Sequence, residues 1–126
     1  MSENDNIETV QRFCAAWSST SGVDVAALLD FFTDDAVYHN MPIQAIQGKD
    51  AIKGIIEQFM TPFERCDWQV SNISAAGDVV LTERVDRFLG PKNVELPVMG
   101  AFELRDGKIA AWRDYFDLGA WTKQMS

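Results

Sequence analysis

The first half of the chain is patterned as helices. Apolar residues recur at spacings of three and four over Ile7–Trp17, which is the period of an amphipathic helix, and the polar run 18–22 ends this stretch. The same pattern predicts a second helix over about Val23–Phe32 and a third that opens at Gln47–Asp50. One short strand, Ala36–Asn40, is expected between the second and third helices.

The second half is patterned as strands, because apolar and polar residues alternate along it. The alternation begins near Trp68–Ile73 and continues through three long segments, Val79–Leu89, Val94–Leu104 and Ile109–Asp117. The dipeptide Asp106-Gly107 between the last two segments is a strong hairpin signal. We therefore expect a meander of long strands.

Helices followed by a strand meander predict an α+β fold, in which a curved, mixed and mostly antiparallel sheet wraps around the N-terminal helices. A short helix with Trp121 is expected at the C-terminus. Because sheets twist, a long sheet with helices on one face can enclose a deep pocket. This order of elements resembles the cone-shaped nuclear-transport-factor-2-like fold. The 126 residues fit one domain of this kind, residues 1–126.

Charge narrows the possible partners. The chain carries 11 Lys and Arg against 19 Asp and Glu, a net charge of −8. Binding to nucleic-acid phosphates or to an anionic membrane surface requires a basic face, so neither partner is expected. The acidic N-terminus lacks the apolar core of a signal peptide, and no run reaches the roughly 18 apolar residues of a transmembrane helix. We therefore expect a soluble, cytoplasmic protein.

The few cysteine and histidine residues narrow the possible chemistry. Cys14 lies in an apolar helical run, so we expect it and Cys66 to be free thiols rather than a disulfide. One His and two distant Cys give no zinc-ligand spacing, and no glycine-rich phosphate loop is present. Any chemistry is therefore expected to use ordinary side chains.

Charged residues interrupt the apolar pattern of the strand Val79–Leu89. Residues two apart on a strand share a face, so Arg84 and Asp86 lie between Val80 and Phe88 on one face. This arrangement is compatible with an ion pair inside a pocket. It is also compatible with a surface pair on the outside of the sheet.

The last strand places Asp114 between two large aromatic residues of the same face, Trp112 and Phe116. A carboxylate in such surroundings is desolvated and needs a charged partner. Arg84 is the candidate partner, because a guanidinium has several donors and can bridge two carboxylates. The alternative is a structural Asp at an exposed position.

The short strand places Tyr38 and Asn40 on one face and His39 on the other. Tyr and Asn side chains together can donate to and accept from one water molecule. The alternative is a capping or turn role before Met41-Pro42, and His39 is interpreted as structural or solvated. The candidate walls of a substrate pocket are apolar or aromatic residues: Trp17, Trp68, Phe88, Leu96, Val98, Trp112 and Phe116.

Three motifs taken together resemble the limonene-1,2-epoxide hydrolase family. They are Tyr38-x-Asn40, Arg84-x-Asp86 and Trp112-Arg113-Asp114, and they occur in the family's order. The resemblance covers about Ile7–Trp121. It implies an apolar pocket, a homodimer and no cofactor. It also implies five polar catalytic residues: Tyr38, Asn40, Arg84, Asp86 and Asp114.

The function that this resemblance implies is the addition of water to a small apolar epoxide, terpene-like or cyclic, to give a vicinal diol. The reaction needs an acid at the epoxide oxygen and a base at the attacking water, and two carboxylates in different environments can supply both. We expect Asp86 to be the acid and Asp114 the base, with Arg84 between them. Tyr38 and Asn40 would hold the water.

Two other functions fit the same fold. A ketosteroid-isomerase-like or polyketide-cyclase-like enzyme would use one Asp as base and would not require a carboxylate pair bridged by Arg. A non-catalytic module that binds a small ligand would keep the aromatic residues and would tolerate the loss of Asp86 and Asp114.

Overall fold

A computed structural model describes residues 1–126 of the chain, which form four helices and six strands. The helices are α1 (Glu3–Trp17), α2 (Val25–Leu29), α3 (Lys49–Met60) and α4 (Leu118–Met125). The strands are β1 (Phe32–Asn40), β2 (Ile46–Gln47), β3 (Arg65–Ala76), β4 (Val79–Leu89), β5 (Val94–Arg105) and β6 (Lys108–Tyr115). The predicted α+β order, helices before a strand meander, is confirmed.

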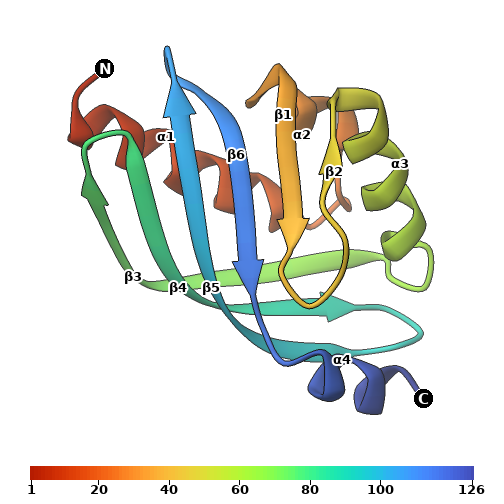
Figure 1. Cartoon of the computed structure of the whole chain (residues 1–126). Helices are drawn as coiled ribbons and strands as arrows, with labels where there is room; N and C mark the ends of the chain where they lie inside the picture. The colour runs from red at the N-terminus through yellow and green to blue at the C-terminus, as the bar shows by residue number, and fades with distance from the viewer.

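The six strands form one curved, unclosed sheet in the order β2-β1-β6-β5-β4-β3. Strands β1 and β6 run parallel, and every other neighbouring pair is antiparallel. Strands β3, β4 and β5 bend strongly along their length, and α1 lies behind the sheet in the view of Figure 1. Helix α1 contacts β3 and β4, α3 contacts β1 and β2, and α4 contacts β5. The sheet therefore curves around the helices.

Local signals set the ends of several elements. The Ser2 hydroxyl accepts a hydrogen bond from the backbone N–H of Asp5 at 3.0 Å, and the Asp5 carboxylate accepts one from the N–H of Ser2, which caps α1. Asp117 caps α4, so β6 ends before it and not at Asp117 as the alternation predicts. Asp106 and Gly107 have φ angles of 52° and 78°, as the predicted hairpin turn requires.

The region between α2 and α3 differs from the sequence prediction. The predicted helix Val23–Phe32 is wrong at its end, because α2 stops at Leu29 and Phe32 begins β1. The cause is long-range pairing: Phe32 is opposite Ile109, whose N–H donates to the carbonyl of Phe31 at 2.8 Å. This contact outweighs the local helical pattern. Strand β1 is therefore longer than predicted, and β2, which the pattern does not predict, pairs beside it.

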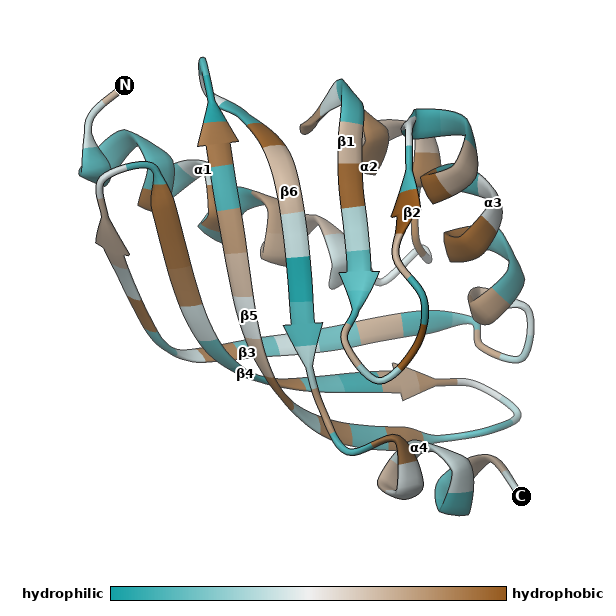
Figure 2. Cartoon of the chain, in the orientation of Figure 1, coloured by the Kyte–Doolittle hydropathy of each residue, from teal (hydrophilic) through white to brown (hydrophobic).

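Aromatic rings form the centre of the core. Phe13 of α1 meets five other rings at centroid separations of 5.0–6.2 Å. These rings belong to Trp17, Phe31, Phe32, Phe102 and Trp112. Brown and teal segments alternate along the long strands in Figure 2, in keeping with one buried and one exposed face. None of the helices is both long enough and apolar enough to cross a membrane.

Candidate active site

Three charged side chains are buried on the inward face of the sheet. Arg84 and Asp86 on β4 are 1% and 2% exposed, and Asp114 on β6 is 4% exposed. They share this face with apolar core residues such as Val80 and Phe88. The alternatives of a surface ion pair and of an exposed Asp114 are therefore excluded. Because isolated buried charges are costly, these groups must compensate one another.

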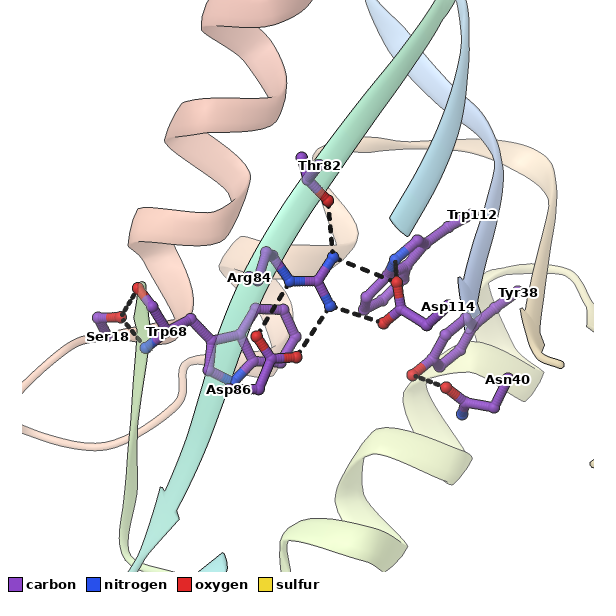
Figure 3. A network of polar contacts seen from close by, with 9 residues as sticks. All are labelled: Ser18, Tyr38, Asn40, Trp68, Thr82, Arg84, Asp86, Trp112 and Asp114. Carbon is purple, nitrogen blue, oxygen red and sulfur yellow. Dashed lines mark hydrogen bonds and ion pairs between the residues drawn. The ribbon is translucent and has the colours of Figure 1, made fainter. Parts of the chain in front are cut away.

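Arg84 holds both carboxylates, as Figure 3 shows. Its Nε and Nη2 donate to Asp86 at 3.0 and 2.8 Å, and its Nη1 and Nη2 donate to Asp114 at 3.2 and 2.8 Å. Nη1 also donates to the Thr82 hydroxyl at 3.2 Å. All five N–H groups of the guanidinium are thus used. On one side, the Trp68 ring lies 4.8 Å from the guanidinium carbon.

A glycine on the intervening strand makes this contact possible. Strand β5 lies between β4 and β6, and its Gly100 is paired with Thr82 on one side and with Asp114 on the other. A Cβ atom at position 100 would lie 2.5 Å from Nη1 of Arg84 and 2.9 Å from Oδ1 of Asp114. Both distances are shorter than van der Waals contact. The missing side chain therefore leaves the space through which Arg84 reaches across β5.

Strand β1 brings a phenol and an amide to the same place. Because β1 pairs with β6 in parallel register, Tyr38 is opposite Trp112 and Asn40 is opposite Asp114. The rings of Tyr38 and Trp112 stack with centroids 4.1 Å apart, and the Tyr38 hydroxyl donates to Oδ1 of Asn40 at 3.1 Å. The Trp112 indole N–H donates to Asp114 at 2.7 Å. The structure thus brings together the five polar residues singled out in the sequence (Figure 3).

Burial and neighbouring charges shift the pKa values of three of these groups. Burial raises the pKa of Asp86 to about 6, against the opposing effect of Arg84. Burial, followed by the charge of Asp114, raises the pKa of the Tyr38 hydroxyl well above its usual range, so Tyr38 stays neutral. Burial disfavours the charged form of Arg84, but the adjacent Asp114 and Asp86 carboxylates outweigh it and hold the Arg84 pKa well above its usual value.

A cavity of about 140 Å³ opens beside the carboxylates. This volume is well below the roughly 300–1,000 Å³ of pockets that hold drug-sized ligands, so the cavity suits a small molecule. Four of its lining residues are polar: Tyr38, Asn40, Asp86 and Asp114. The other eight are apolar: Ile43, Ile55, Phe59, Trp68, Phe88, Phe116, Leu118 and Trp121.

The structure divides the residues that the sequence suggests as pocket walls. Those that line the cavity are Trp68, Phe88 and Phe116. Those that do not line it, and lie in the buried core instead, are Trp17, Leu96, Val98 and Trp112. Trp17 stacks on Trp68 at 4.2 Å, and Trp112 stacks on Tyr38. These two rings therefore support the residues that face the cavity, and strand alternation alone does not distinguish the two positions.

Five lining residues are not indicated by the strand pattern: Ile43, Ile55, Phe59, Leu118 and Trp121. Ile55 and Phe59 are four residues apart on the apolar face of α3, a spacing that does signal a shared inward position. Ile43 lies in the turn after β1, where no period exists. His39 points to the other face of β1, and its Nε2 lies 2.9 Å from the Ile43 carbonyl oxygen.

Two carboxyl groups that can give and accept a proton lie together beside a small apolar cavity. Asp86 has the raised pKa of a carboxyl that can give a proton, and Asp114 lies on the far side of Arg84. The amide N–H groups of Asn40, together with the Tyr38 oxygen, can hold a water molecule near Asp114. No three His, Cys, Asp or Glu side chains are grouped as metal ligands. Such a site can add water to a neutral molecule.

The sequence matches one family of known proteins. Residues 4–126 match the family model described as the limonene-1,2-epoxide hydrolase catalytic domain. The chain is similar to epoxide hydrolase EphG of Mycobacterium tuberculosis, with 38% identity over 86 residues. That match covers 68% of this chain and 57% of the relative, so the chain spans little more than half of that relative's length.

Solved structures share the fold. An LEH-like epoxide hydrolase from M. tuberculosis superposes with a TM-score of 0.81 at 32% identity, covering 97% of this chain and 90% of that chain. A structure described as a SnoaL-like polyketide cyclase from Jannaschia superposes with a TM-score of 0.83, covering 98% of this chain and 93% of that chain. Its identity is 21%, so this second likeness concerns the fold alone.

Proposed function

The chain belongs to the limonene-1,2-epoxide hydrolase family, and we propose that it adds water to a small apolar epoxide, terpene-like or cyclic, to give a vicinal diol. The observation that carries this proposal is the buried Asp86–Arg84–Asp114 triad beside an apolar cavity of about 140 Å³. An epoxide is uncharged and strained. Its opening requires an acid for the departing oxygen and a base for the attacking water.

Asp86 is the acid in this mechanism. The epoxide C–O bond breaks as the carboxyl proton moves to the ring oxygen, which would otherwise leave as a strongly basic alkoxide. Burial supports this role, because a pKa of about 6 keeps part of Asp86 protonated near neutral pH. A solvated aspartate, with a pKa of about 3.9, would be almost fully ionised there.

Asp114 is the base. A water molecule held by Tyr38 and Asn40 attacks an epoxide carbon, and as the new C–O bond forms its proton passes to Asp114. Three N–H donors, from Arg84 and Trp112, fix the orientation of this carboxylate. After the reaction Asp114 holds one proton and Asp86 lacks one, so a proton returns to Asp86 directly or through water and the site is reset.

The bridged carboxylate pair supports hydrolysis over the two alternatives suggested by the fold. An isomerase-like or cyclase-like enzyme needs one carboxylate base, and a binding module needs neither carboxylate. Burying a second carboxylate is costly, and neither alternative gives this carboxylate a function that would explain the cost. Placing both carboxylates on Arg84 therefore supports a reaction in which one proton is given and another is taken.

Single-turnover hydrolysis in ¹⁸O-labelled water tests the activity and the mechanism together. With enzyme in excess over limonene-1,2-epoxide or cyclohexene oxide, we expect every diol to contain one oxygen atom from the solvent, because water attacks directly. If an aspartate attacked instead, an ester would form and the first diol would carry an oxygen of the enzyme. Mass spectrometry of the diol distinguishes the two routes.

Three variants control this experiment. Asp86→Asn and Asp114→Asn should each lower kcat by at least about 10²-fold, because each removes one proton-transfer partner. Asp106→Asn lies in the exposed β5–β6 turn, away from the cavity, and should react at the wild-type rate. Diol without solvent oxygen would refute the water mechanism. Absence of diol from every epoxide would refute the hydrolase function.

The proposal extends to assembly and location. A homodimer is supported by three exposed apolar residues on the outer face of the sheet, Leu81, Met99 and Tyr115, which a second copy would cover. A cytoplasmic location is supported by Cys14 and Cys66, which are both free and buried. The net charge of −8 opposes binding to nucleic acid or to anionic membranes.

A further inference from the structure

Aromatic rings make up the inner wall of the cavity next to Asp86. Trp68 and Phe88 are 7% and 4% exposed, which places them at its depth. Phe59 of α3 and Trp121 of α4 belong to the same wall, and both contact Phe88. A ligand whose reacting atoms lie at the carboxylates therefore places the rest of its body against rings contributed by α3, β3, β4 and α4.

Three of these rings stand at nearly right angles to the fourth. The planes of Phe59, Trp68 and Trp121 make angles of 82°, 73° and 88° with Phe88, at centroid separations of 5.3–6.1 Å. Rings in this arrangement offer both faces and edges to their surroundings. An aromatic ligand finds edge-to-face or offset-stacked partners among them, whereas a puckered saturated ring makes only dispersion contacts.

The aliphatic lining residues do not offer an equivalent surface at depth. Ile43 and Leu118 are 47% and 39% exposed, which places them at the mouth of the cavity. Ile55 is the one aliphatic lining residue that itself packs against the buried core. Apart from Ile55, the part of the cavity that contacts the ligand's body is therefore aromatic, and the part that faces solvent is aliphatic.

The position of Phe88 limits the distance between the epoxide and the body of the ligand. Phe88 follows Asp86 by two residues on the same face of β4, so their Cα atoms lie about 7 Å apart. A ring bonded directly to the epoxide contacts Phe88 while the epoxide oxygen lies at Asp86. The cavity volume of about 140 Å³ leaves room for a single ring.

We propose that the substrate is an aryl epoxide, with one aromatic ring bonded directly to an epoxide carbon. This inference rests on the proposed hydrolase function and adds the kind of ring that the cavity selects. The ring lies among Phe59, Phe88 and Trp121. The epoxide C–O bond breaks as its oxygen takes the proton of Asp86, the water oxygen bonds to carbon, and the proton of the water passes to Asp114. The product is an aryl-substituted 1,2-diol.

Phenyloxirane and cyclohexyloxirane provide a matched pair of probes, because they have the same number of non-hydrogen atoms and differ in whether the ring is flat. Aryl epoxides are intrinsically more reactive, so a difference in kcat/KM alone would not show which ring the cavity prefers. Binding of the two diol products is therefore measured by calorimetry, in addition to kcat/KM for the two epoxides. We expect the phenyl diol to bind about tenfold more tightly than the cyclohexyl diol, the effect of one or two aromatic contacts. We expect kcat/KM to favour phenyloxirane in the same direction.

Variants of the wall locate the source of this preference. Phe88→Leu and Trp121→Leu should each reduce it to about twofold or less, while cyclohexyloxirane is still hydrolysed. Phe63→Leu is the matched control, because Phe63 lies 5.4 Å from Phe88 and 5.9 Å from Trp121 without lining the cavity. It should keep the full preference. Thermal unfolding of all three variants shows whether each is folded.

The outcomes separate this inference from the proposed function. Equal binding of the two diols, or tighter binding of the cyclohexyl diol, overturns the aryl assignment and leaves the hydrolase function standing when both epoxides give diols. A preference that Phe63→Leu loses as fully as Phe88→Leu also overturns it. If neither epoxide is hydrolysed the aryl assignment fails, and limonene-1,2-epoxide then shows whether the hydrolase function fails with it.

Discussion

At the scale of single residues, Asp86 and Asp114 share Arg84 but differ in their other partners. Asp86 accepts hydrogen bonds from Arg84 alone, whereas Asp114 also accepts the indole N–H of Trp112. Fewer donors and nearly complete burial both favour the protonated form of Asp86. The acid role assigned to Asp86 therefore follows from what surrounds it and not from its residue type.

This difference predicts the pH dependence of the reaction. Asp86 must carry a proton to act as the acid, and its pKa is about 6. We therefore expect kcat/KM to fall about tenfold for each pH unit above 6, since kcat/KM reports ionisation of the free enzyme. Initial rates with a neutral epoxide between pH 5 and about 9 measure this decline. A kcat/KM that rises through pH 6 would show that Asp86 works in its ionised form.

The same pKa shift has a stability consequence that serves as an independent check. The Asp86 pKa is raised from 3.8 to about 6 on folding, so the folded chain binds this proton more tightly than the unfolded chain. Its contribution to the free energy of unfolding is therefore fully present below about pH 4 and is lost as the pH rises through about 6. Urea unfolding of the wild type and of Asp86→Asn should differ most in their pH dependence within that window.

Residues on one strand could be grouped from the sequence, but their surroundings could not. Alternation is a local property, so it was sufficient to place Arg84 with Asp86 and Trp112 with Asp114. Whether either face is buried depends on α1 and α3, which lie far away in the sequence. For the same reason the sequence does not show that Trp68 lines the cavity while Trp17 packs behind it.

At the scale of elements, strand β5 contributes no polar group to the triad, yet it decides whether the triad forms. Arg84 on β4 and Asp114 on β6 are next-nearest neighbours in the sheet, with β5 between them. The two side chains meet above Gly100. A strand with a side chain at this position would separate the two halves of the site.

We therefore expect Gly100→Ala to lower kcat by at least about 10²-fold, the effect of losing one correctly placed acid or base. The new Cβ would lie 2.5 Å from Nη1 of Arg84 and 2.8 Å from the Thr82 hydroxyl, so the guanidinium must move. Because the change acts through the triad, the pH at which kcat/KM declines should also shift. Rates and pH profiles measure both effects.

Gly54→Ala is the matched control for this prediction. Gly54 lies on α3 with nothing within 4 Å of an added Cβ, and Ala stabilises a helix by roughly 0.5–1 kcal/mol relative to Gly. This variant should keep full activity and melt slightly higher. Wild-type kcat and an unchanged pH profile in Gly100→Ala would show that Arg84 reaches Asp114 without the space at position 100.

Helices and strands with a strong apolar period, and turns with a local signal, could be predicted from the sequence. Strand ends and short strands that depend on pairing with another strand could not. The hairpin at Asp106-Gly107 is specified by two adjacent residues, so the sequence alone identifies it. The beginning of β1 at Phe32 depends on Ile109, and β2 depends on pairing with β1. The space at Gly100 depends on two strands at once. These contacts join residues that are far apart in the chain, so no local pattern in the sequence indicates them.

At the scale of the whole molecule, the outer face of the sheet remains partly apolar. Leu81, Met99 and Tyr115 are 49%, 51% and 47% exposed, and they lie on the neighbouring strands β4, β5 and β6. Met99 is opposite Tyr115 in the β5–β6 register. Pro97 and Val85, which are paired with each other, border a hollow on this face. Exposed apolar residues grouped in this way support the proposed homodimer, in which a second copy would cover them.

We expect sedimentation equilibrium at micromolar concentration to give twice the mass of one chain. Met99→Glu should shift the protein to the monomer, because the new carboxylate would be buried in the interface beside Glu83, which is opposite position 99. Gln58→Glu, on the exposed side of α3, adds the same charge elsewhere and should remain dimeric. A wild-type mass of a single chain would contradict the homodimer without affecting the assignment of the triad.

The complete use of Arg84 has a consequence for inhibitors. A guanidinium is a common anchor for phosphate, sulfate and carboxylate ligands. Here Arg84 is 1% exposed and its five N–H groups already donate to Asp86, Asp114 and Thr82. An anion would have to displace one of these partners and lie beside two aspartates. Buffer anions are therefore not expected to bind at Arg84, and a compound made to block this pocket should not carry a negative charge.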